Sequence, residues 1–341
     1  MAKQNNNNNN NNIGLLRYLT FDKEARADDQ VTKPIEGGRL KYILSTFRAH
    51  NSDLTLPNVL YLITLLPMIA VYVFLQIFTI EKASYVLNGI NNIPYFMSGI
   101  GLGISSSSNL LEAQLNTLNV YYMYFLGLAV GFFIMSIGLA GLMRITMKFL
   151  WKDSFITKKD SYGNNVPRTV LEFFNGIKKY WWQMLVWGLI GMILIAGVSS
   201  SVIYFVGNFW AGTAGAGVYI LLIFSIIVGV IGSMFLMFMP SMIVMYNIPF
   251  SAKIKNSLIL TFQMFMPNLI VLAVIAAPIL AIALTSGIAN VVFVALIIVF
   301  GGSFYSILVG GYVQYYAEKI ITPVANARAN KSGKKKIKNN M

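Results

Sequence analysis

Long apolar runs, separated by short polar and basic stretches, dominate the chain from residue 58 onward. About 20 apolar residues in a helix are enough to cross the roughly 30 Å hydrocarbon layer of a bilayer. Six runs reach this length, and none carries Asp, Glu or His near its middle. They lie at residues 58–80, 119–147, 183–206, 217–246, 258–284 and 288–316. The pattern predicts an all-α polytopic membrane protein, a bundle of about six transmembrane helices.

The composition agrees with this prediction. Of the 341 residues, 56% are apolar and only 11% are charged, whereas soluble globular proteins carry roughly 25% charged residues. The mean hydropathy is +0.64. The chain has no cysteine, which excludes disulfides and thiolate metal sites. His50 is its single histidine, which excludes a metal or catalytic cluster built from histidines.

Lys and Arg gather in every second connection between the predicted spans. The rich connections, each with two or more basic residues, are 1–57, 148–182, 247–257 and 317–341. The poor ones, with at most one, are 81–118, 207–216 and 285–287. Cytoplasmic loops carry an excess of Lys and Arg, so the alternation predicts that both termini are cytoplasmic. Topology therefore accounts for the net charge of +14, and we expect no nucleic-acid partner.

The topology divides the chain into three parts. We expect residues 1–57, which include eight consecutive Asn residues, to form a basic cytoplasmic segment without a cleavable signal peptide, and the first span to act as the insertion signal. Residues 58–318 form the membrane domain, with an outer loop at 81–118 and an inner amphipathic loop at 148–182. Residues 319–341 form a basic cytoplasmic tail.

The lack of cysteine allows a direct test of this topology. We expect a single cysteine at position Ser106 to react with a membrane-impermeant thiol reagent in intact cells, and cysteines at Ser161 or Ser332 to stay unlabelled. Labelling at either of the last two positions would reject the topology. So would protection at Ser106 when the denatured protein reacts normally.

Side chains for catalysis or ion coupling are scarce. General acid–base chemistry needs shielded titratable groups, and proton relays use Asp, Glu or His within the membrane. We therefore predict no catalytic, cofactor-binding or metal-binding residues, and no enzymatic activity. The neutral polar residues within the spans either join helices or line a path for a neutral solute. They are Ser199, Ser200, Ser201, Gln263, Asn268, Asn290, Ser303 and Ser306.

The inner loop predicts a contact surface. A helix starting near Pro167 would carry an apolar stripe of Val170, Phe173, Phe174 and Ile177. Basic and aromatic residues border or follow this stripe. The candidate contact residues are Arg168, Phe173, Phe174, Lys178, Lys179, Trp181 and Trp182. Such a helix at the inner interface would bind anionic lipid, dock a partner protein, or simply connect two spans. The lysine-rich tail at 331–338 would also attract anionic lipid.

Several segments resemble the YesL-type family of bacterial integral membrane proteins. The sequence NVLYLITLLP, from Asn58 to Pro67, is similar to the family's opening span. The sequence GLAGLMRITMKFLWKD, at 138–153, is similar to the family's second span and the basic stretch that follows it. The similarity continues through 167–183, 240–267 and 301–316. About seventy residues separate the Leu-Pro of the first span from the next matching stretch, where the family has a short connection.

The resemblance implies a multi-pass protein of a Gram-positive-type bacterial plasma membrane, often associated with carbohydrate ABC transporters. Three functions remain open. The first is a non-enzymatic accessory or assembly subunit beside such a transporter. The second is a transport protein in its own right, either a permease subunit or a carrier of a neutral solute. The third is a structural protein linked to lipid or the envelope.

Overall fold

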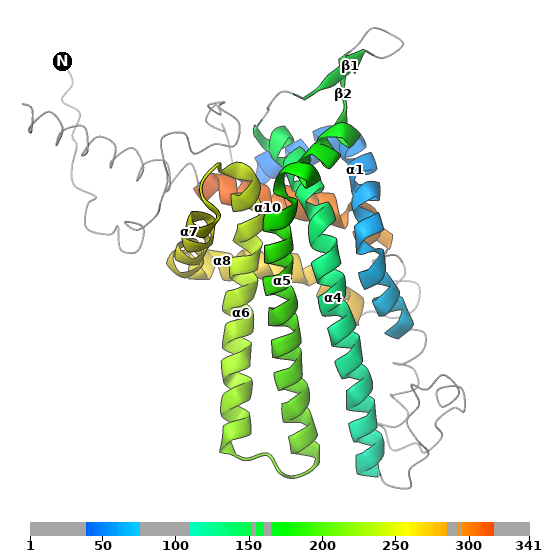
Figure 1. Cartoon of the computed structure of the whole chain (residues 1–341), viewed down its shortest axis with the longest axis vertical. Helices are drawn as coiled ribbons and strands as arrows, with labels where there is room; N and C mark the ends of the chain where they lie inside the picture. Colours follow the sequence, from blue (N-terminus) through cyan, green and yellow to red (C-terminus); the bar gives the residue numbers. More distant parts are fainter. Residues whose placement is uncertain are drawn as a thin grey trace, which may run out of the picture. The chain divides into compact units, whose positions relative to one another are not determined.

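The computed structural model describes residues 39–75, 110–151, 155–159, 165–284 and 295–316, together with Val292. The predicted N-terminal segment up to residue 38, the outer loop up to residue 109 and the basic tail lie outside the described residues. Described elements are α1 (Arg39–Leu75), α4 (Leu110–Trp151), β1 (Thr157–Lys159), β2 (Asn165–Pro167), α5 (Thr169–Trp210), α6 (Ala216–Met245), α7 (Phe250–Gln263), α8 (Phe265–Leu284), the π-helical turn η3 (Ile297–Gly301) and α10 (Gly302–Tyr316) (Figure 1).

The protein is an all-α polytopic membrane protein. Within the described ranges, four helices are long and apolar enough to cross a membrane, and a bent helix pair adds a fifth if it forms one span. The helices α1, α4, α5 and α6 contain most or all of the first four predicted spans. The sixth predicted span, 288–316, is described only in part, as η3 and α10.

The helices extend beyond the apolar runs that predicted them. Helix α4 begins at Leu110, so the last residues of the predicted outer loop are helical. Helix α5 runs without interruption from Thr169 through the span predicted at 183–206. The separate short helix expected from Pro167 is therefore the beginning of a 42-residue helix. Each added residue continues the ladder with one new hydrogen bond, so a helix need not end where the hydrophobic run ends.

The fifth predicted span, 258–284, is not one straight helix. Helices α7 and α8 are bent by 97° at Met264, which has φ −113° and ψ 34°. Pro267 explains the break, because proline lacks an amide hydrogen and clashes with the carbonyl four residues earlier. The helices that contain Pro67, Pro240 and Pro278 continue through these residues.

The inner loop contains a small antiparallel hairpin. Strands β1 and β2 pair Thr157 with Pro167, Lys158 with Val166 and Lys159 with Asn165. The amide of Arg168 then donates to the carbonyl of Ile156, at 2.8 Å. Strand β2 thus leads directly into α5.

Packing divides the chain into two units. Unit 1 comprises Met1–Leu54, Met143–Arg168 and Met237–Met341, and unit 2 comprises Thr55–Leu142 and Thr169–Leu236. Helices α1, α4 and α6 contribute residues to both.

Glycines bring the helices of unit 2 together. On α4, Gly131 approaches the backbone of Met68 on α1, and on α5, Gly188 approaches Ser136 of α4. On α6, Gly232 lies against Leu194 of α5. Membrane helices lack a hydrophobic driving force for association, so close backbone approach at small residues is a main source of their packing energy. These glycines therefore act as close-packing positions between the helices of unit 2.

Helices α5 and α6 form a tightly closed pair (Figure 1). Gly212 has a φ of +69°, a conformation that suits glycine, and its amide donates to the carbonyl of Phe209. The amide of Thr213 donates to the carbonyl of Asn208. These two bonds form a Schellman motif, which ends α5 and turns the chain toward α6.

In unit 1, α10 packs on the end of α4 and the start of α1. Gly310 faces Met147 and Leu150, and Gly311 faces Ile43. The hydroxyl of Tyr42 donates to the carbonyl of Leu150, at 2.6 Å. The kink in α1 lies at His50, whose ring stacks on Phe149 with 4.2 Å between ring centroids.

Candidate functional site

The first turns of α5 hold most of the predicted contact residues, and they divide between two faces. Phe173 is buried, with 2% of its surface exposed, together with Thr169, Gly176 and Tyr180. The side chains of Phe174, Lys178, Lys179, Trp181 and Trp182 are exposed, as is Arg168 just before the helix. The prediction that Phe173 shares an apolar contact stripe with Phe174 is therefore wrong, because Phe173 lies on the buried side of the helix and Phe174 on the exposed side.

Gly141 of α4 determines which of the two phenylalanines is buried. A Cβ built on Gly141 would lie 2.7 Å from the ring and 2.7 Å from the carbonyl oxygen of Phe173. Only glycine leaves space for this contact. The aromatic ring of Phe173 thus fastens the start of α5 to α4 within unit 2.

Two contacts between α4 and α5 require α5 to bend. On α4, Gly141 and Ser136 lie about 7.5 Å apart along the axis, whereas their partners on α5, Phe173 and Gly188, are separated by about 22 Å of helix. A straight helix alongside α4 cannot make both contacts. The first turns of α5 therefore cross α4, as the ribbon shows (Figure 1).

Glu172 is a buried acid that the sequence interpretation missed, because it falls in the predicted inner loop, outside the spans. It lies in the first turn of α5 and is 1% exposed. A carboxylate at this position interacts favourably with the positive end of the helix dipole. Glu172 is three residues from Thr169 and four from Gly176. This helical spacing could have indicated that all three lie on one buried face.

The bend between α7 and α8 gathers buried polar groups in unit 1. The side-chain amide of Asn268 donates to the carbonyls of Leu260 and Thr261, both at 3.2 Å. Its oxygen accepts a hydrogen bond from the hydroxyl of Tyr312 on α10, at 2.7 Å. Asn268 is fully buried. It supplies partners to carbonyls at the end of α7, where the helical ladder stops.

Lys253 of α7 is the second polar group that the sequence interpretation missed, since it was placed in a basic cytoplasmic connection. It is 3% exposed, and its Nζ donates to the carbonyl of Ile243 at 3.0 Å. Ile243 belongs to the last turn of α6, where carbonyls lack helical partners and the dipole is negative. Lys253 therefore caps α6. Nearby in sequence, the buried hydroxyl of Ser257 has no hydrogen-bond partner among the described residues.

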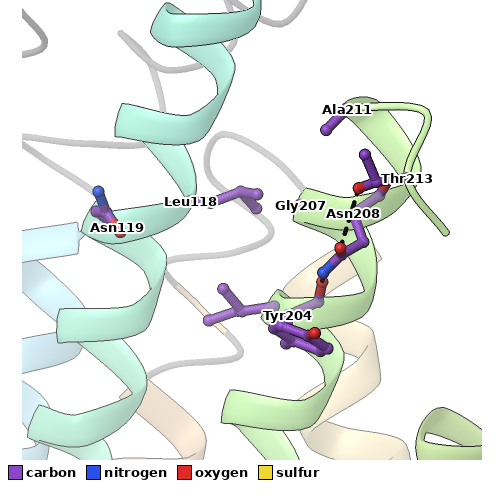
Figure 2. Close-up of a pocket in the computed structure, with 8 residues that line it drawn as sticks. Leu118, Asn119, Tyr204, Gly207, Asn208, Ala211 and Thr213 are labelled. Atoms are coloured by element: carbon purple, nitrogen blue, oxygen red, sulfur yellow. Dashed lines mark hydrogen bonds between the residues drawn. The ribbon is translucent and has the colours of Figure 1, made fainter. Parts of the chain in front are cut away.

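A shallow pocket of about 380 Å³ lies in unit 2, between the ends of α4 and α5. Leu118, Tyr204, Asn208 and Thr213 are among its lining residues, and none of the lining residues is charged (Figure 2). Asn208 donates to the carbonyl of Tyr204 at 2.8 Å and accepts from the Thr213 hydroxyl at 3.0 Å. Leu118 points toward α5 and Asn119 points away from it (Figure 2). The polar atoms thus serve mainly to close the end of α5.

Four other predicted polar residues of the spans also bond locally. Ser199, Ser200 and Ser201 donate to carbonyls four residues earlier on α5, and Ser306 does the same on α10. Asn290 lies outside the described residues. Among the residues that the structure covers, no group of three His, Cys, Asp or Glu side chains is placed to hold a metal ion. No protein-family model, curated protein or solved structure matches the chain.

Proposed function

We propose that the protein is a non-enzymatic accessory or assembly subunit of a membrane complex in the bacterial plasma membrane. The resemblance to the YesL-type family makes a carbohydrate ABC importer the proposed partner. In this role the chain contributes contacts and membrane anchoring, and the partner supplies nucleotide hydrolysis and the transport path.

The internal bonding of Asn268 is the observation that supports this proposal most. Transporters commonly bind their solutes where a membrane helix is broken, because the freed backbone groups coordinate the solute. At the break between α7 and α8, the carbonyls of Leu260 and Thr261 already accept hydrogen bonds from Asn268. The serines of α5 also bond to their own helix. These groups stabilise the helices and leave little polar surface for a solute.

A carrier of a neutral solute is the second candidate. It is favoured by the 97° bend itself and by the buried, uncharged side chains near it, including Ser257 and Asn268. In a carrier, Asn268 would exchange its bond with Tyr312 for a bond to the solute.

Copurification and uptake together distinguish the two candidates. We expect the tagged protein, extracted in mild detergent, to retain transporter subunits in fixed stoichiometry, and a tagged multi-pass protein of unrelated function to retain none. We expect the purified protein alone to take up no neutral solute into liposomes. Solute uptake above that of empty liposomes, lost on Asn268→Ala in a folded variant, would reject the accessory role and establish the carrier.

A further inference from the structure

We propose that the exposed face of the first turns of α5 binds the headgroups of anionic phospholipids. This surface, called the α5 interfacial face, lies entirely within unit 2. Its residues are Leu171, Phe174, Lys178, Lys179, Trp181 and Trp182.

The α5 interfacial face combines aromatic and cationic side chains on one side of the helix. At about 100° per residue, its six members fall within an arc of about 160°. Phe174 and Trp181 lie at one edge, Lys178 near the middle and Lys179 at the other edge. The buried residues of the same turns occupy the opposite side.

The charges of these turns are sorted between the two sides. The only acid between Thr169 and Trp182 is Glu172, which is buried. Both lysines are exposed, and exposed Arg168 directly precedes the helix. Among the residues of these turns, the α5 interfacial face therefore carries positive charge and no acid of its own, which complements an anionic membrane surface.

The aromatic residues place this face at the depth of the headgroups. Trp181 and Trp182 are 51% and 44% exposed, and they stand immediately before the apolar stretch at 183–206. Tryptophan is enriched where hydrocarbon meets water, because its ring is apolar and its N–H is polar. The lysines can extend their apolar stems along the hydrocarbon and keep their ammonium groups at the phosphates.

The bend in α5 gives these turns a suitable direction. Because they cross α4 and do not continue along it, one side of the turns can lie against a membrane surface. An amphipathic helical segment binds a bilayer in this way, with its apolar and aromatic side chains in the interface. The contact of Phe173 with Gly141 holds the opposite side against the protein.

Tryptophan quenching by brominated lipids tests this proposal on the full-length protein. The protein is reconstituted in phosphatidylcholine vesicles containing either brominated phosphatidylglycerol or brominated phosphatidylcholine. We expect stronger quenching by the anionic lipid, and a preference that falls as salt rises. Each lysine near an anionic surface contributes about a fivefold gain in binding. In the double variant Lys178→Gln/Lys179→Gln, the preference for the anionic lipid over phosphatidylcholine should therefore fall at least tenfold.

Three further variants serve as controls. Lys178→Arg/Lys179→Arg keeps the charge and should keep the preference. Lys334→Gln/Lys335→Gln removes two charges of the predicted tail and should not change the quenching. Trp181→Phe/Trp182→Phe should abolish most of the additional quenching by the anionic lipid. This result would locate the lipid at the α5 interfacial face.

An unchanged preference in Lys178→Gln/Lys179→Gln would overturn the proposal. Loss of a copurifying protein in this variant, with the lipid preference intact, would also overturn it and assign the face to a protein partner. The outcome does not depend on the accessory role, since lipid quenching is measured without any partner.

Discussion

Replacing Asn268 with leucine is expected to lower the free energy of unfolding by about 2 to 4 kcal/mol. The change removes all three hydrogen bonds of the Asn268 side chain. It leaves the carbonyl of Thr261 and the hydroxyl of Tyr312 without these bonds. Because the side chain of Asn268 is fully buried, water does not readily replace them. Thermal and chemical unfolding in detergent, followed by circular dichroism, measures the loss.

Two companion variants test the reason for this loss. Tyr312→Phe removes one of the three bonds and should cost about 1 kcal/mol. In the double variant with Asn268→Leu the two losses should not add, because both act on the same bond. Asn119→Leu changes an exposed asparagine and should stay within about 0.5 kcal/mol of the original protein. If Asn268→Leu is no worse than Asn119→Leu, the bond network does not stabilise the bend.

Replacing Gly141 with alanine is expected to destabilise the protein by about 1 to 3 kcal/mol. The new methyl group would meet both the ring and the backbone carbonyl of Phe173 at 2.7 Å. The ring can rotate, but the carbonyl belongs to α5 and moves only with the helix. We therefore expect the first turns of α5 to shift away from α4, with greater exposure of Phe173.

Gly197→Ala is the matched control, since Gly197 also lies inside a long helix. A Cβ at Gly197 would have no neighbour within 4 Å. Alanine stabilises a helix interior by up to about 1 kcal/mol relative to glycine, so this variant should be neutral or more stable. The same thermal unfolding assay compares both variants. Equal effects at the two positions would show that the Gly141–Phe173 contact does not limit stability.

The sequence was sufficient to predict the spans in α4, α5 and α6, because their long apolar runs leave no alternative to a membrane helix. Its prolines indicated kinks or interruptions in spans 1, 4 and 5, but not which proline would break a helix. Pro267 and other prolines offered similar local signals, yet the helices continue through Pro67, Pro240 and Pro278. At the break, Tyr312 donates a hydrogen bond to Asn268, and a contact between residues 44 positions apart cannot be predicted from the local sequence.

Prediction of the contact residues was limited in the same way. Exposure of Lys178, Lys179, Trp181 and Trp182 agrees with the expected amphipathic pattern. The choice between Phe173 and Phe174 depends on Gly141, which belongs to another helix. Burial of Lys253 depends on where α6 ends. The contact of Phe173 with Gly141 and the bond of Lys253 involve neighbours distant in sequence, and local periodicity does not identify these partners.

The Schellman motif at Gly212 limits how α5 and α6 can move. Only residues 211–215 join the two helices, so Trp210 and Ala216 can separate by at most about 21 Å even in a fully extended chain. With the motif intact, the separation is smaller still. If α5 and α6 move apart, they must therefore rotate about a point near Gly212. The largest displacement of α5 is then at its far end, where Trp181 and Trp182 precede the apolar stretch.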